Sequence, residues 1–292
     1  MSERTTTYDQ PGATDRQFPG LSPTVRGIVT DSIRSRDRSF AVACCTVAGE
    51  IAAASADENR RQSIDSTLAD LGDAVACFEA YVSIRRALLT GDRFDRPVDR
   101  DAAILGSDYL HAAAYAGVAA AVESVERTLE LYSVLAEAST TLATEFLAAA
   151  SDEATPGSDD RYPPEAILAG TAATVGATAA GATDEVRAAC DRYARSLRGA
   201  IAAATPSAEE PLETATLILT GEHTRDTIAG EVDWADDHSD AVASHLERAR
   251  DAIATLEGEL EGHVDAGTDR TPLARLERAT RIPFQHVESG NE

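Results

Sequence analysis

Apolar residues recur at helical spacing along most of the chain. Between Ser63 and Leu89 they follow one another at steps of three and four, at Ile64, Leu68, Leu71, Val75, Phe78 and Val82. Stretches in which β-branched and polar residues alternate, as they would in a half-buried strand, are absent. The pattern therefore predicts an all-α protein.

Turn residues divide this pattern into roughly ten helices, which we expect to form a single bundle. Ser22 and Pro23 are suited to begin the first helix, and Gly91 and Pro97 are read as helix breakers. The further helices are predicted at Ser39–Ala54, Ser63–Leu89, Ala102–Ala121, Glu123–Ala150, Glu165–Ala180, Asp184–Ala204, Pro211–Thr220, His238–Gly262 and Pro272–Ile282. We expect one domain over residues 21–284, a disordered polar tail over 1–20 that can be removed, and a flexible tail over 285–292.

Composition narrows the class of protein. The chain has 292 residues, of which 43% are hydrophobic, and this is enough for one substantial core. The formal net charge is -24, and every Lys or Arg position is an arginine. This balance is typical of a folded, salt-adapted (halophilic) surface, and it argues against nucleic acid as a partner. The four cysteines lie in apolar runs without CxxC spacing, so we expect small buried side chains in a reducing compartment. With neither a leader nor a membrane span in the pattern, we expect a cytoplasmic protein.

Several segments resemble the trans-prenyltransferases (polyprenyl synthetases), the all-α enzymes that chain isoprenyl diphosphates. The clearest is AAILGSDYLH from Ala102, which is similar to the family phrase AILAGDYLL, with Asp108 at the position of its aspartate. Others, in consistent order over Ser22–Pro283, are RSRDRSFAVACC, PEAILAGTAATVGATAAGA, YARSLRGAIAAATPSAEE and SHLERARDAIATLEGELEG. The resemblance implies the isoprenoid-synthase fold and a dimer formed through the helices that follow the first phrase. The small residues of Ala112–Val122 suit such a contact.

The catalytic groups that the resemblance implies are missing from their places. Family members hold magnesium ions with aspartate clusters on two facing helices, because the departing diphosphate carries several negative charges. The first cluster falls within IRRALLTGDR, where only displaced acids are available, namely Asp92, Asp95, Asp99 and Asp101. The second falls at Thr205, Pro206 and Glu209, where proline interrupts the helix.

The basic groups that would hold a diphosphate are only partly present. Family lysines align with Ser35 and Pro164, and the threonine after the second lysine aligns with Glu165. The phenylalanine–glutamine pair aligns with Ile201 and Ala202. The remaining candidates for diphosphate binding are Arg36, Arg38, Arg93 and Arg96, although an ion-paired surface loop explains the last two more simply.

Asp108 is expected to be a buried acid paired with Arg85 or Arg86 of the neighbouring helix, and not a metal ligand. The stretch DWADDHSD, from Asp233 to Asp240, gathers possible cation ligands, but an acidic helix start accounts for them equally well. His238 and His245 are too far apart for an HExxH-type zinc site. We therefore predict no metal site.

Three functional hypotheses remain. The leading one is a catalytically degenerate relative (a pseudoenzyme) that acts as a binding or partner subunit in isoprenoid lipid synthesis, as a homodimer or with an active synthase, or by holding a prenyl chain. The second is an active magnesium-dependent synthase that uses the displaced acids with Glu209 or Glu210 opposite. The third is a helical interaction protein unrelated to isoprenoids. A central cavity walled by the helices beginning at Ser63, Ala102, Glu165 and Asp184 would favour the family.

Overall fold

A computed structural model describes residues 18, 20–33, 38–91, 93–150, 162–204, 209–222, 240–260 and 271–284. These residues form ten α-helices and one short 3-10 helix, and no strand occurs among them. The all-α prediction is confirmed. The helices are α2 (Pro23–Ser32), α3 (Phe40–Ala52), α4 (Glu58–Thr90), α5 (Pro97–Ala121), α6 (Val125–Ala150), α7 (Pro164–Ala180), α8 (Asp184–Ala204), α9 (Glu209–Thr220), α10 (Asp240–Glu259) and α11 (Pro272–Ala279), followed by η3 (Ile282–Phe284).

Local sequence signals set several of the helix ends. Ser22, Ser39 and Thr271 each cap a helix by accepting a hydrogen bond from the backbone N–H three residues later. Gly91 and Gly181 end α4 and α7 in the left-handed conformation, where glycine has no steric penalty. Pro97 is the one breaker that we misread. It is the first residue of α5, a position at which its missing N–H costs no hydrogen bond.

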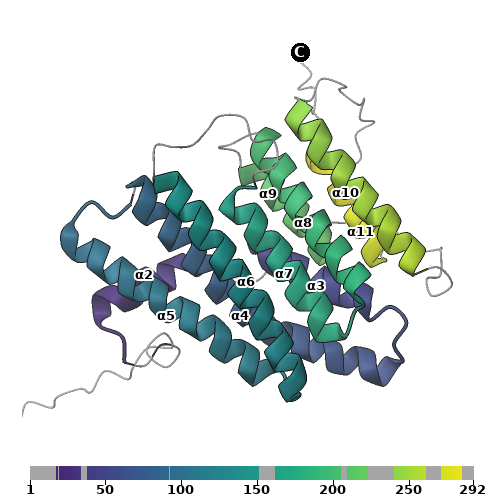
Figure 1. The fold of residues 1–292 in the computed structure, drawn as a ribbon, viewed down its shortest axis with the longest axis horizontal. Coiled ribbons are helices and arrows are strands. Elements are labelled where there is room, and N and C mark those ends of the chain that lie inside the picture. Colours follow the sequence, from purple (N-terminus) through teal and green to yellow (C-terminus); the bar gives the residue numbers. More distant parts are fainter. Residues whose placement is uncertain are drawn as a thin grey trace, which may run out of the picture.

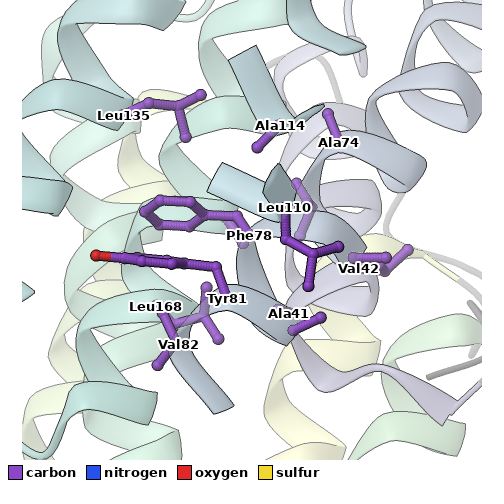
Figure 2. Packing of buried hydrophobic residues seen from close by; sticks show 14 of the residues in the cluster. Ala41, Val42, Ala74, Phe78, Tyr81, Val82, Leu110, Ala114, Leu135 and Leu168 are labelled. Atoms are coloured by element: carbon purple, nitrogen blue, oxygen red, sulfur yellow. The ribbon is translucent and has the colours of Figure 1, made fainter. Parts of the chain in front are cut away.

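The middle of the molecule is formed by α3 and α7, which pack against each other (Figure 1). Each contributes to two clusters of buried side chains. Cys45 and Leu168 belong to the cluster with α4, α5 and α6, whereas Cys44 and Ala173 belong to the cluster with α8 to α11. Because both helices are covered on two sides, they are apolar nearly all round, as a central helix must be. Figure 2 shows the first cluster, where Leu168 of α7 lies near Tyr81 and Val82 of α4.

The cysteines are free thiols in this core. Cys44, Cys45 and Cys190 are buried and Cys77 is half-buried. Burial raises the pKa of Cys45 and of Cys190 to about 12. These side chains therefore pack as small apolar groups, as the sequence indicates.

The expected tails fall almost entirely outside the described residues, with one exception. Phe18 lies inside the segment 1–20, which we expected to be a disordered tail, yet it is buried and packs edge-on against Tyr109, with ring centroids 6.0 Å apart. Phe18 therefore contributes to the packed core, and the boundary of the tail stays a prediction.

Candidate functional site

The carboxyl-terminal end of α4 is tied to its neighbours by arginine–carboxylate pairs. Arg85 forms an ion pair with Asp108 of α5, and Arg86 forms one with Glu165 in the first turn of α7. The guanidinium of Arg85 also lies over the ring of Tyr81, 5.8 Å from its centroid. The expected partner of Asp108 is thus present. Its expected burial is wrong, because 59% of its side chain is exposed.

The displaced acids that the structure describes do not form a metal-binding group. Asp95 and Asp101 are exposed, and Asp99 accepts a hydrogen bond of 2.6 Å from Nε of Arg96 in the first turn of α5. Arg96 therefore forms an ion pair with Asp99, as expected for an ion-paired surface loop. Asp92 lies outside the described residues. Across the part of the chain that the structure describes, no group of three or more His, Cys, Asp or Glu side chains is placed to hold a metal ion.

The described candidates for diphosphate binding show only local surroundings in the structure. Arg38 is exposed at the start of α3, and Arg93 lies over the ring of its neighbour Phe94 at 5.6 Å. Arg36, the remaining candidate, lies outside the described residues. Thr205 and Pro206, which align with the start of the second acidic cluster, and most of DWADDHSD also lie outside the described residues. Glu210 is exposed on α9.

An aromatic cluster fills the space between α4, α5 and α6. The imidazole of His111 lies 4.7 Å from the ring of Tyr81 and 5.2 Å from that of Tyr115, and its Nε2 is 2.9 Å from Oγ of Ser139. Burial and then Arg85 lower the pKa of His111, and Asp108 opposes them. A neutral imidazole packed in this way has a structural role.

A second histidine is packed at the contact between α8 and α10. The ring of His245 lies so close to Gly199 that an added Cβ there would meet it at 2.8 Å. Burial, followed by the charge of Arg248, lowers the pKa of His245. Its Nδ1 has no hydrogen-bond partner among the described residues.

A cleft of about 580 Å³ lies between α6, α7 and α8. We expected a central cavity walled by α4, α5, α7 and α8. This cleft is lined by α7 and α8, but α4 and α5 do not contribute to it. Charged and hydroxyl side chains dominate its lining: Glu130, Glu137, Thr141, Tyr162, Thr171, Thr174, Thr178, Asp184, Arg187, Asp191, Arg192 and Arg195. Sequence reasoning missed this cleft. The available signal was the row of threonines at steps of three and four on the alanine-rich α7, which matches one face of a helix.

Ion pairs organise two parts of the cleft. At one end Arg187 pairs with Asp184 and lies 3.7 Å from Glu130, while Nη1 of Arg127 donates to the carbonyl oxygen of Thr178 at the end of α7. Further along, Nε of Arg195 donates to both carboxylate oxygens of Asp191 at 2.8 Å.

Comparison with solved structures shows the fold. The structure is similar to a heterotetrameric geranyl pyrophosphate synthase from mint, with a TM-score of 0.50 and 12% identity over 92% of this chain and 93% of that one. It is also similar to a geranylgeranyl pyrophosphate synthase from Corynebacterium glutamicum, with a TM-score of 0.50 and 16% identity over 91% of this chain and 88% of that one. No family model and no curated protein matches the sequence. The chain therefore has the isoprenoid-synthase fold of the trans-prenyltransferases, as the sequence resemblance implied.

In the described part of the chain, no helix is long and apolar enough to span a bilayer.

Proposed function

We propose that this protein is a non-catalytic relative of the trans-prenyltransferases that serves as a partner subunit in isoprenoid lipid synthesis. The proposal rests on two ion pairs at the end of α4, Arg85 with Asp108 and Arg86 with Glu165. In the family that the sequence resembles, this helix end carries the first cluster of magnesium-binding aspartates.

The charges at this helix end are the reverse of those that the reaction needs. Arg85 and Arg86 place positive charge about one turn before the positions aligned with the first aspartate cluster, and each is already engaged with a carboxylate. Glu165 stands next to the position aligned with a diphosphate-binding lysine, where its negative charge would repel the ligand. These features support a protein that keeps the fold of the family and does not catalyse prenyl transfer.

The outer faces of α5 and α6 support a partner role. Their exposed side chains include Leu105, Ala112 and Ala116 on α5, and Leu129 and Leu147 on α6. The mint protein of similar fold is heterotetrameric, so assembly of different subunits has a precedent on this fold. The same face would serve a homodimer or a complex with an active synthase.

The deciding experiment is a turnover assay of the full-length protein with Mg²⁺ and allylic and homoallylic diphosphates in molar potassium chloride. We expect no chain elongation, while a salt-tolerant active synthase in the same buffer elongates the substrates. Any robust chain elongation would overturn the proposal, and elongation that is lost when Asp92, Asp95, Asp99 or Asp101 is replaced would identify a working synthase with displaced acids.

A further inference from the structure

The cleft between α6, α7 and α8 has the wrong walls for a prenyl chain. Among the described residues that line it, only Val134, Ala138 and Ala188 are aliphatic, and the others carry charges or hydroxyl groups. Placing a hydrocarbon here would remove water from those groups without replacing its hydrogen bonds, which is unfavourable. A volume of about 580 Å³ is nevertheless in the range of small-molecule sites. The occupant that suits this cleft is polar.

Unused hydrogen-bond donors are concentrated on the α8 wall. Arg192 is exposed and makes no ion pair with the described residues, so its guanidinium donors are available. Arg195 uses only Nε in its contact with Asp191, which leaves its terminal nitrogens free to donate. These residues are three positions apart, and so they lie on one face of the helix. Two adjacent guanidiniums of this kind suit a carboxylate.

The opposite wall and the floor offer acceptors. Glu137 of α6 is exposed, and its only hydrogen bond with the described residues comes from Oγ of Ser133 at 3.4 Å. On the floor, Thr171 and Thr174 each donate the hydroxyl proton to a carbonyl of their own helix, so the hydroxyl oxygens remain able to accept. The buried hydroxyl of Thr178 has no partner among the described residues. An ammonium group would satisfy this side of the cleft.

The charge of the whole chain selects between a simple anion and a neutral ligand with two charges. At a formal net charge of -24, the protein repels a net anion that approaches the cleft when the salt concentration is low, and salt screens this repulsion. A zwitterion carries no net charge, and it can still offer a carboxylate to one wall and an ammonium to the other.

We propose that this cleft binds a small zwitterion of the amino-acid type, with its carboxylate on Arg192 and Arg195 and its ammonium on Glu137. None of the residues named for the partner contact lines this cleft. The binding proposal therefore goes beyond the partner role, and each of the two can fail without the other.

The test is calorimetric titration of the full-length protein in molar potassium chloride with glycine, β-alanine and γ-aminobutyrate. These probes share the two charges and differ in the distance between them. Butyrate and butylamine, each with one charge, are the comparison ligands. We expect at least one zwitterion to bind, and both single-charge analogues to bind about tenfold or more weakly, because each lacks one charged hydrogen bond.

Matched variants locate the binding. Arg192→Gln and Glu137→Gln should each weaken zwitterion binding about tenfold or more. Arg100→Gln and Glu126→Gln, at exposed positions outside the cleft on α5 and α6, should leave it unchanged. The proposal is overturned if no zwitterion binds the wild type, if butyrate binds as tightly as the zwitterions, or if the cleft and control variants behave alike.

Discussion

Two arginine–carboxylate pairs in this protein illustrate how burial decides what an ion pair contributes. Arg85 and Asp108 meet at the surface, with 33% and 59% of their side chains exposed. Arg275 and Glu50 meet in the interior, with 8% and 30% exposed, and Nη1 of Arg275 also donates to the carbonyl oxygen of Leu219 at 2.8 Å. Burial, then the charge of Arg278, lowers the pKa of Arg275 to about 10. The buried pair and its hydrogen bond join α11 to α3 and α9 in the interior. The exposed pair joins α4 to α5 at the surface, where it contributes less.

Removing one carboxylate from each pair should therefore have unequal effects. Glu50→Gln leaves a buried guanidinium without its counter-charge, and we expect the free energy of unfolding to fall by about 3 kcal/mol. Asp108→Asn should change it by no more than about 0.5 kcal/mol, because water and salt already screen this pair. Urea unfolding of both variants in molar potassium chloride checks the prediction. A large loss from Asp108→Asn together with a small one from Glu50→Gln would contradict it.

The two packed histidines predict a pH dependence. Burial lowers the pKa of His111 and of His245 below the usual range, so the folded protein binds fewer protons than the unfolded chain in this pH region. The contribution is fully favourable above the unfolded pKa of about 6.5 and is lost as the pH falls towards the folded values. We expect unfolding at lower urea concentrations at about pH 5.5 than at about pH 7.

Variants separate this effect from the titration of the carboxylates. His245→Gln and His111→Gln remove a titrating ring, so each should flatten the dependence of stability on pH over the same interval. The measurement is the urea midpoint at each pH. Slopes that stay unchanged in both variants would show that the imidazoles are not responsible.

At the scale of the elements, the contact between α3 and α7 depends on one glycine. A Cβ added to Gly176 would lie 1.9 Å from the carbonyl oxygen of Cys45, and a backbone atom cannot move aside as a flexible side chain can. The two helices approach this closely because residue 176 has no side chain. Such an approach determines how the central helices fit between the two core clusters.

Gly176→Ala should therefore force the two central helices apart and lower the free energy of unfolding by about 2 kcal/mol or more. Gly27→Ala is the matched control, since this glycine lies within α2 and nothing is within 4 Å of its added Cβ. There alanine should stabilise the helix by about 0.5–1 kcal/mol. Thermal unfolding followed by circular dichroism distinguishes the two. Similar shifts for both substitutions would mean that the close approach does not limit stability.

The elements could be predicted from the sequence, and their mutual contacts largely could not. Helix spacing and caps such as Ser22 and Ser39 are local signals, and they place most helix ends within a few residues. The pairing of Asp108 with Arg85 followed only because a resemblance placed the two helices side by side. The exposure of the Asp108 side chain depends on which elements cover α5, and a local sequence pattern does not report this. The cleft forms only where α6, α7 and α8 meet, so it also leaves no local pattern.

For the whole molecule, an acidic protein leaves the exposed face of one described helix, α5, with little charge. Between Ile104 and Ala120 the exposed side chains of α5 include a single charge, Asp108, and it is paired. On α6 the exposed side chains include Leu129, 62% exposed, and Leu147, 73% exposed. In a chain of net charge -24, exposed apolar side chains gathered on one helix suit a contact with another protein.

Self-association through this face is the remaining prediction. Two copies of so acidic a chain repel one another, and salt screens the repulsion, so we expect a dimer in molar potassium chloride that dissociates as salt is lowered. Ala116→Arg places a long charged side chain in the middle of the exposed face of α5 and should yield monomers at high salt. Ala254→Arg, at an exposed position on α10, is the matched control and should remain dimeric. Sedimentation velocity of the three proteins measures the outcome. If wild type sediments as a monomer in molar salt, the face is not a self-association surface; if both variants remain dimeric, the contact lies elsewhere.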